Sequence, residues 1–248
     1  MKKHSVAIVM CAYNEAQGIA EFVAELAKTF EVHQPIFFVV DDCSTDETSS
    51  VLQELRDRHQ VNVVVERNRV NLGHGPSTIR ALLLGIESQS EYVISIDGDG
   101  QFVGLDVCAM YEVMLEKKVD VCEGVRRFRT DFAYRKVVTK FVRFLVKIKC
   151  GESPADANTP LRIYRSQRLE LLLSGIRTNS LIPNLFLSAK SRRLKFVIEE
   201  FPVLSIPRRG GSTQGVTWGA NKSIFPNQKF LKFCLAACKE WFKKENWI

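Results

Sequence analysis

Two aspartates separated by a single glycine follow a short apolar run in the stretch "YVISIDGDGQ", residues 92–101. Asp97 and Asp99 carry like charges on a turn that Gly98 and Gly100 make flexible. Hard divalent cations such as Mg²⁺ and Mn²⁺ prefer oxygen ligands and often share one or two carboxylates with a substrate phosphate. The pattern therefore indicates a cation site that also includes Gln101, with a solvated acidic turn as the alternative.

The elements that must position this turn are alternating strands and helices in the first half of the chain. Apolar runs rich in β-branched residues predict strands at residues 5–10, 36–40, 61–66 and 92–96, and helical spacing predicts helices at 15–30, 44–55 and 76–86. Fully apolar strands joined by helices are typical of a parallel sheet covered on both faces. One polar motif follows each strand: "AYNE", "DDCSTD", "NLGHG" and "DGDGQ". They lie beyond the carboxyl ends of the strands, which is where ligands bind to such sheets.

The second half of the chain is less regular, and no linker divides it into two domains. We predict a strand at 119–126, a basic amphipathic helix at 134–149, a strand at 194–206, a flexible basic loop at 208–215 and a last amphipathic helix at 227–244.

Composition limits the classes of partner. The chain has 248 residues, 46% of them hydrophobic, enough for one substantial core, and a formal net charge of +7 that points to an anionic partner. No nucleic-acid partner is expected, because the basic residues are not interleaved with aromatic residues of a known module. Seven scattered cysteines without a CxxC pair predict a reducing, cytosolic compartment, with neither a disulfide framework nor a zinc site. No run reaches the roughly 18 apolar residues that a membrane span needs.

At this point the chain resembles a known family. Its motifs in order are "CAYNE", "VVDDCSTDET", "NLGHGPSTIRALLLG", "ISIDGDGQF", "GVRRFR", "YRKVVTKFV", "DANTPLRIYR" and "RRGGST". Together they are similar to family 2 glycosyltransferases, within them the polyprenyl-phosphate (dolichol-phosphate mannose synthase-like) branch. The resemblance implies an α/β GT-A (nucleotide-diphospho-sugar transferase) fold with a mostly parallel central sheet and helices on both faces. We expect a catalytic domain at 1–215 and an amphipathic helical tail at 216–248.

The resemblance also implies roles for individual residues. The donor nucleotide would contact Ala12, Tyr13, Glu15, Asp41, Asp42, Gly73, His74 and Asp97, with Asp42 nearest the base. Asp97, Asp99 and Gln101 would hold the metal, and the catalytic residues would be Asp97, Asp99, Arg208 and Arg209. The acceptor phosphate would meet Arg126, Arg135, Thr139, Asp156 and Ser212.

Several residues have a structural alternative or depart from the family pattern. Tyr13 could pack in the core, and Asp156 could pair with an arginine of the sheet. Asp46 is expected to cap the following helix rather than to bind a ligand. Cys11 stands where the family often has Pro, Cys43 where it often has Gly, and His74 where it often has Lys.

The reaction that these residues allow is inverting transfer of a sugar from a nucleotide-diphosphate donor. A divalent cation, Mg²⁺ or Mn²⁺, with Arg208 or Arg209, would offset the charge of the leaving diphosphate. No strong general base is evident, which favours a lipid phosphate acceptor, because a phosphate monoester is already anionic at neutral pH. The alternatives are a glycosyltransferase acting on a hydroxyl of a glycan or glycolipid, with Asp156 as the base, and an inactive nucleotide-sugar-binding subunit.

Two amphipathic segments predict peripheral attachment to the cytoplasmic face of a membrane. In the first, an apolar face is formed by Tyr134, Val137, Val138, Phe141, Val142, Leu145 and Ile148. In the second, the face is formed by Phe230, Phe233, Cys234, Ala237, Cys238 and Trp241. Lysines and arginines surround both faces, as in helices that lie among lipid headgroups, although helices packed on a core show the same pattern.

Overall fold

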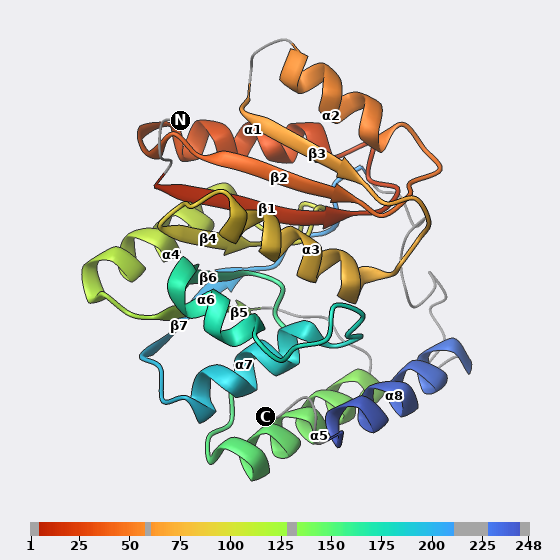
Figure 1. Cartoon of the computed structure of the whole chain (residues 1–248), viewed down its shortest axis with the longest axis vertical. Coiled ribbons are helices and arrows are strands. Elements are labelled where there is room, and N and C mark those ends of the chain that lie inside the picture. Colours follow the sequence, from red (N-terminus) through yellow and green to blue (C-terminus); the bar gives the residue numbers. More distant parts are fainter. Residues whose placement is uncertain (1–4, 58–60, 128–132, 211–227, 244–248) are drawn as a thin grey trace.

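A computed structural model describes residues 5–57, 61–127, 133–210 and 228–243, and the side chains of all of these except 133–137. Its centre is a seven-stranded sheet in the order β3-β2-β1-β4-β6-β5-β7 (Figure 1). The strands are β1 (Val6–Ala12), β2 (Ile36–Asp41), β3 (Val63–Arg67), β4 (Tyr92–Ser95), β5 (Val121–Arg127), β6 (Arg162–Arg165) and β7 (Ile198–Leu204). The mostly parallel sheet is confirmed, since only β6 runs antiparallel to its neighbours, β4 and β5.

The direction of β6 brings both halves of the chain to one edge. Because β6 is antiparallel to β4 and to β5, these two strands run the same way, and their carboxyl ends share an edge with those of β1, β2 and β3. The amino end of β6 lies at that edge as well. The turn after β4, the end of β5 and the loop before β6 therefore meet there. The sequence analysis missed β6, whose four residues begin and end with arginine.

Helices cover both faces of the sheet, as predicted (Figure 1). One buried cluster joins the sheet to α1 (Ile19–Thr29), α2 (Thr48–Asp57) and α4 (Gly104–Lys117). The other joins it to α3 (His74–Glu87), α5 (Ala133–Cys150), α6 (Ser166–Leu173), α7 (Pro183–Arg193) and α8 (Gln228–Trp241). Strand β1 serves both, because Ile8 and Met10 pack in the first cluster and Ala7 and Val9 in the second, as the alternation of a strand requires. A short 3₁₀ helix, η1 (Glu31–His33), follows α1.

Three of these helices, α4, α6 and α7, were not predicted. Helix α7 shows why, because its sequence "PNLFLSAKSRR" carries no apolar stripe at helical spacing. It is buried on nearly all sides, and even Ser188, Ser191 and Arg192 are at most 8% exposed. A helix surrounded by protein needs no polar face, so the periodicity that reveals a surface helix is missing.

Helices α5 and α8 lie side by side at one end of the molecule, away from β1 to β3 (Figure 1). The ammonium of Lys149 on α5 lies 5.9 Å from the ring centroid of Trp241 on α8, and the ring of Trp241 stacks on Phe186 of α7 at 5.6 Å. Glu240 fixes α8 further by accepting a hydrogen bond from the backbone N–H of Leu181 at 2.9 Å. Helix α8 is therefore packed on the rest of the fold, and the predicted boundary at 215/216 falls outside the described residues.

The apolar face of α5 differs from the predicted one, whereas that of α8 agrees with it. On α5, Leu145 and Val146 are buried, whereas Phe141 and Ile148, which were expected to share the face of Leu145, are 48% and 65% exposed. On α8, the predicted face packs inward through Phe233, Ala237 and Trp241. Large apolar side chains nevertheless remain on the outside, namely Phe141, Phe144 and Ile148 on α5, Leu231 and Leu235 on α8, and Phe242 directly after α8.

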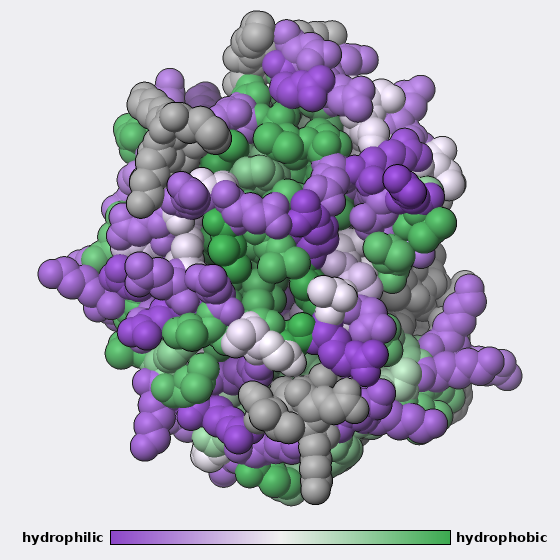
Figure 2. Space-filling model, viewed as in Figure 1, coloured by the Kyte–Doolittle hydropathy of each residue, from purple (hydrophilic) through white to green (hydrophobic). Residues whose placement is uncertain are grey.

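Among the described residues, no helix has the length and the apolar content to cross a membrane. The face seen in Figure 2 carries hydrophobic surface over its middle, interrupted and bordered by hydrophilic side chains.

Candidate active site

The turn that follows β4 is packed against the end of β1 and against the loop after β7. The N–H of Gly98 donates to the carbonyl of Cys11 at 3.1 Å, so the turn continues alongside β1. Gly100 has φ of +66°, and a Cβ there would lie 2.6 Å from Cδ of Arg209. Position 100 therefore favours glycine for two reasons: its backbone is left-handed, and a side chain there would clash with Arg209. The turn can expose Asp97 and Asp99 because the glycines let other segments lie directly beside it.

Four charged side chains gather at this turn: Glu15, Asp97, Asp99 and Arg208. The Nε of Arg208 donates to Oε2 of Glu15 at 2.9 Å, and its Nη2 donates to Oε1 of the same carboxylate. Burial raises the pKa of Glu15, and the Arg208 pair offsets only part of that effect. Burial, followed by the charges of Asp97 and Glu15, raises the pKa of Asp99 to about 7. Three carboxylates around one guanidinium leave an excess of negative charge.

This excess fits a divalent cation. Carboxylate oxygens are ligands that Mg²⁺ and Mn²⁺ prefer, and a cation beside Asp97 and Asp99 would relieve the repulsion that raises the pKa of Asp99. The amide nitrogen of Gln101, the predicted third ligand, donates to the carbonyl of Ile206 at 3.4 Å, and the role of its amide oxygen as a ligand stays a prediction. Its backbone carbonyl accepts from the N–H of Ile206 at 3.0 Å, so Gln101 ties the turn to the segment after β7.

His74 and Cys11 approach Asp97 from two other motifs. The Sγ of Cys11 lies 3.3 Å from Nδ1 of His74, and Nε2 of His74 lies 3.9 Å from Oδ1 of Asp97. The contact with Cys11, followed by the charges of Asp97 and Asp99, raises the pKa of His74 to about 10. His74 is the first residue of α3 and can place a positive charge where the family often has Lys.

Asp41 and Asp42, expected at the nucleotide, are buried and hold the loops around it. Asp41 accepts from the N–H of Ser44 at 2.9 Å and from the Ser49 hydroxyl. The two oxygens of Asp42 accept from the N–H groups of Leu72 and Gly73, each at 2.8 Å. Asp42 thereby fixes the loop that leads into α3, and its contact with the base stays a prediction.

The neighbouring loops agree with other expectations. Asp46 accepts from the N–H of Thr48, the first residue of α2, at 3.0 Å, which confirms the predicted cap. Cys43, which stands where the family often has Gly, has φ of +61°, a left-handed conformation in which glycine is less strained. Ala12 is buried and its carbonyl accepts from the N–H of Asp42 at 2.9 Å, whereas Tyr13 is half-buried.

Arg208 and Arg209, predicted together as catalytic residues, have different surroundings. Arg209 points to α1, where its Nη1 donates to Glu21 at 3.0 Å and its Nη2 donates to Glu25. Its guanidinium carbon lies 5.2 Å from the ring centroid of Phe22. Arg208 alone of the two pairs with Glu15, whereas Arg209 bonds to the turn through its backbone N–H, which donates to the carbonyl of Asp99 at 3.1 Å, and through Nε, which donates to the carbonyl of Gly100 at 3.2 Å. The catalytic role of both arginines stays a prediction.

The predicted acceptor residues lie partly within the described chain. Arg126, near the end of β5, donates from Nε to Oδ2 of Asp156 at 2.7 Å and from Nη2 to Oδ1 at 3.0 Å. This pair lies at the same sheet edge as Asp97. It agrees with the alternative stated for Asp156, that this residue pairs with an arginine of the sheet. Thr139 is half-buried on α5. Ser212 and the side chain of Arg135 lie outside the described residues.

The comparisons with known proteins can be set beside this geometry. The sequence profile described as Glycosyl transferase family 2 matches residues 7–177, more than half of the chain. The chain belongs to glycosyl transferase family 2. All the donor-side residues named above except Arg208 and Arg209 fall inside the matched range.

Curated relatives are similar over most of this chain. An undecaprenyl-phosphate 4-deoxy-4-formamido-L-arabinose transferase of Pseudomonas fluorescens is 28% identical over 197 residues, which cover 78% of this chain and 57% of that protein. The enzyme of the same name from Edwardsiella ictaluri is 25% identical over 217 residues, covering 84% and 62%. The family 2 chain described here thus spans roughly half to two thirds of the length of these relatives.

Solved structures show the fold. A mannosyltransferase from Pyrobaculum calidifontis, in complex with GDP-Man and Mn²⁺, superposes with a TM-score of 0.59 at 17% identity, over 85% of this chain and 58% of that one. The glucosyl-3-phosphoglycerate synthase of Mycobacterium tuberculosis gives a TM-score of 0.59 at 15% identity, over 95% and 80%. These likenesses confirm the GT-A fold expected from the sequence.

Sequence reasoning missed the contact between Cys11 and His74. Both had been noted as departures from the family pattern, in two motifs that follow different strands of one parallel sheet. Two departures in motifs at the same edge could have been recognised as a pair, because a substitution at one position often accompanies a change at its neighbour in space. Sequence spacing alone could not show it, since the residues are 63 positions apart.

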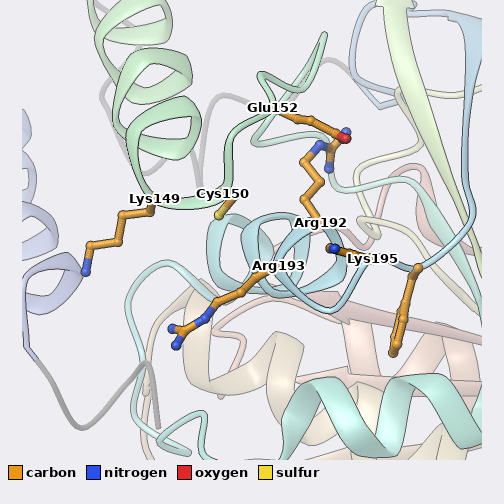
Figure 3. A pocket seen from close by; sticks show the side chains of 7 residues that line it. Lys149, Cys150, Glu152, Arg192, Arg193 and Lys195 are labelled. Atoms are coloured by element: carbon orange, nitrogen blue, oxygen red, sulfur yellow. The ribbon is translucent and has the colours of Figure 1, made fainter.

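A cavity of about 420 Å³ lies elsewhere, at the amino end of β7. It is lined by Lys149, Cys150, Glu152, Arg192, Arg193, Lys195 and Phe196. Figure 3 shows that Lys149 and Arg193 extend away from Arg192, so the cations do not converge on one point. Since Phe196 precedes β7, this cavity belongs to the edge opposite Asp97 and takes no part in the candidate site.

Proposed function

We propose that this family 2 chain transfers a sugar from a nucleotide-diphosphate donor to a polyprenyl phosphate, with inversion at the anomeric carbon. The observation that carries the proposal is the cluster of Glu15, Asp97, Asp99 and Arg208 at the sheet edge that also holds Arg126. The names of the curated relatives, which are undecaprenyl-phosphate sugar transferases, support the acceptor class.

Asp97 and Asp99 would hold the cofactor, a divalent cation, either Mg²⁺ or Mn²⁺. Bound there, the cation would supply Lewis-acid stabilisation of the leaving diphosphate. Support comes from the raised pKa of Asp99, to about 7, since burial, followed by the charges of Asp97 and Glu15, disfavours the ionised form that a cation would stabilise. Arg208 lies beside the same carboxylates and would exchange Glu15 for a donor phosphate oxygen, a stronger charge-assisted partner.

The donor nucleotide would lie over the loops that follow β1, β2 and β3. Asp42 holds Gly73 and Leu72 in place, and the start of α3 would offer its N–H groups and His74 to the donor phosphates. The roles of Tyr13, Asp41 and Asp42 at the base and ribose remain part of the proposal.

The acceptor would approach from the side of β5. Arg126 is oriented by Asp156, which is only 6% exposed and accepts two hydrogen bonds from the guanidinium. A carboxylate held in this way is poorly placed to take a proton from a sugar hydroxyl, so the geometry favours the acceptor that needs no base. A phosphate monoester is such an acceptor, because it is already ionised at neutral pH. Arg135, Thr139 and Ser212 are proposed to complete the acceptor site.

We further propose that the chain binds peripherally to the cytoplasmic face of a membrane through α5 and α8. Support comes from the exposed apolar side chains on these helices and directly after α8: Phe141, Phe144, Ile148, Leu231, Leu235 and Phe242. Exposed basic residues such as Lys147 and Lys239 accompany them, as in helices that lie at an anionic lipid surface. The catalytic unit at 1–215 would thereby meet a phosphate that stays at the bilayer surface, with the segment at 216–248 as an amphipathic tail.

Product analysis tests the acceptor class. The protein is incubated with labelled nucleotide sugars and Mn²⁺, and either undecaprenyl phosphate or a panel of oligosaccharides is supplied. We expect label in the organic phase only when the lipid phosphate is supplied. Mild acid should release this label, as expected for a glycosyl phosphate. Label that enters the oligosaccharides instead would overturn the proposed acceptor and leave the family assignment untouched.

A further inference from the structure

We propose that Cys11, His74 and Asp97 form a binding site for Zn²⁺ at the edge of the donor site. The site is additional to the oxygen-ligand site of Asp97 and Asp99 and shares Asp97 with it. Its three ligands come from three different motifs, so no spacing in the sequence predicts it. It depends on neither the identity of the acceptor nor the transfer reaction.

The geometry of the three side chains carries the inference. One ligand atom from each residue, the Sγ of Cys11, a ring nitrogen of His74 and a carboxylate oxygen of Asp97, lies within 4.8 Å of the other two. In a tetrahedral zinc site, with Zn–S near ~2.3 Å and Zn–N near ~2.0 Å, ligand atoms are about 3 to 4 Å apart. The 3.3 Å between Cys11 and His74 already meets this spacing.

The remaining adjustment is a rotation of the imidazole, because Cys11 lies 3.3 Å from Nδ1 of His74 and Asp97 lies 3.9 Å from Nε2, and one ring nitrogen must face both. His74 is 42% exposed and Asp97 is 28% exposed at the side chain, so both have room to rotate towards one ion. Thr78 steadies the arrangement, because its hydroxyl donates to the carbonyl of His74 at 2.8 Å and lies 3.4 Å from Sγ of Cys11. A site with three protein ligands leaves a fourth position open for water or a ligand oxygen.

The chemistry of the ligands decides which ion fits. A thiolate and an imidazole bind borderline and softer ions, such as Zn²⁺ and Co²⁺, far better than Mg²⁺, which prefers oxygen. Because Asp97 belongs to both sites, Zn²⁺ held by Cys11 and His74 should compete with the cation that Asp97 and Asp99 hold. The two departures from the family pattern would thus create a soft-metal site beside a hard-metal one.

A second cluster on the protein must be removed before the site can be tested. His33, Cys108 and Glu112 also place ligand atoms within 4.8 Å of one another, and His33 is 2.8 Å from Glu112. They lie near α1 and α4, on the other face of the sheet. All measurements therefore use the full chain with Cys108→Ala, which takes the thiol out of this cluster.

The test is titration of the metal-free Cys108→Ala protein with Co²⁺, followed by displacement with Zn²⁺. A thiolate bound to Co²⁺ gives a charge-transfer band in the near ultraviolet. We expect one equivalent of Co²⁺ to produce this band and Zn²⁺ to abolish it. Adding Cys11→Ser should remove the band, and adding His74→Lys should weaken Co²⁺ binding by at least about tenfold. Adding Asp99→Asn, which leaves all three ligands, should retain the band.

The outcomes separate this site from alternatives. A band that survives Cys11→Ser comes from another cysteine and overturns the proposal, and so does the absence of any band. Circular dichroism of each variant shows whether it is folded, and Cys11→Ser is close in size to the native residue. Competition is measured by the electron paramagnetic resonance of bound Mn²⁺. Zn²⁺ should release Mn²⁺ from the Cys108→Ala protein, and release that is unchanged by adding Cys11→Ser would contradict the shared role of Asp97.

Discussion

Arg208 and Glu15 are 193 positions apart in the sequence, yet the guanidinium of one and the carboxylate of the other form a two-point ion pair, with Nε 2.9 Å from Oε2. The pair closes the loop after β7 onto the end of β1. It also keeps a positive charge beside Asp97 and Asp99. Burial lowers the pKa of Arg208, but the negative charges of Glu15, Asp99 and Asp97 outweigh this effect and raise it. Arg208 therefore lies, paired with Glu15, at the place where a bound diphosphate would bring further negative charge.

Arg208→Ala should lower turnover by at least about a hundredfold, as expected for a charge that stabilises a leaving group, while the dissociation constant of the donor rises much less. Arg208→Lys should recover part of the turnover. Steady-state kinetics and donor calorimetry on both variants give this comparison. Equal losses in turnover and in donor affinity would indicate uniform binding and contradict the catalytic role.

Arg209 provides the comparison, because it follows Arg208 directly but its guanidinium contacts Glu21, Glu25 and Phe22 on α1 and, at the turn, only the carbonyl of Gly100. Arg209→Ala should lower the free energy of unfolding by about 1–2 kcal/mol through lost ion pairs and packing. Turnover of the folded fraction should change little. Urea denaturation measures the first effect, and a variant of native stability without activity would reverse the roles given to the two arginines.

Asp99 makes the stability of the metal-free protein depend on pH. Its pKa is about 7 in the folded chain against 3.8 ordinarily, so the folded state holds the proton more tightly. This contribution to stability is present at about pH 4 and is lost as the pH rises through 7. Asp99→Asn should therefore be more stable than the native protein at pH 8 in EDTA, by up to roughly 4 kcal/mol, since the pKa values of about 7 and 3.8 differ by about 3 and each pKa unit is worth ~1.4 kcal/mol.

The difference between the two proteins should shrink towards pH 5, where Asp99 is protonated. Adding Mn²⁺ at pH 8 should stabilise the native protein and leave Asp99→Asn nearly unchanged. Thermal unfolding at several pH values, with and without Mn²⁺, provides the measurement. If Asp99→Asn is no more stable than the native protein at pH 8, the electrostatic strain ascribed to this turn is absent.

Arg126→Lys should raise the KM for the lipid phosphate by about tenfold or more, because lysine cannot form two parallel hydrogen bonds with Asp156 and also direct a planar group to a phosphate. Donor affinity should stay the same. The control is Arg168→Lys, since Arg168 pairs with Asp120 at 2.8 Å at the opposite edge of the sheet. A change in donor affinity alone would remove Arg126 from the acceptor side.

Membrane binding is predicted to depend on the outside of α5 and α8. Replacing Phe144 and Leu235, which are 57% and 65% exposed, with serine should release the protein from anionic vesicles. Leu105→Ser is the control, because Leu105 is 73% exposed on α4, which covers the other face of the sheet. Co-sedimentation at low and high salt gives the result. Binding that is equal in the double variant and the control would exclude this surface.

The sheet edge could be predicted from sequence because it rests on local patterns. Each of β1 to β4 is an apolar run followed within a few residues by a polar motif, and in a parallel sheet this order alone brings the motifs together. Asp97 and Asp99 are neighbours in the chain, so their proximity required no knowledge of the fold. The cap at Asp46 was predicted for the same reason, since it reaches only two residues along the chain.

What the sequence concealed depends on contacts over long separations. Nothing local distinguishes Arg208 from Arg209, and only their packing gives one to Glu15 and the other to Glu25. Nothing local shows that both oxygens of Asp42 accept from backbone N–H groups about 30 positions further along the chain. The face of α5 was misjudged because an apolar stripe does not reveal which of its side chains meet the core and which meet the solvent. Helix α7, buried all round, showed no stripe at all.

The binding of a nucleoside diphosphate with and without Mn²⁺ tests the central claim most directly, because it requires neither the sugar nor the acceptor to be known. Calorimetry with UDP, GDP, CDP and dTDP is performed on the native protein and on Asp97→Asn. We predict that at least one diphosphate binds in Mn²⁺, that EDTA weakens it by at least about tenfold, and that Asp97→Asn removes the dependence on Mn²⁺. Binding of equal affinity in Mn²⁺ and in EDTA would contradict a cation and diphosphate site at Asp97 and Asp99.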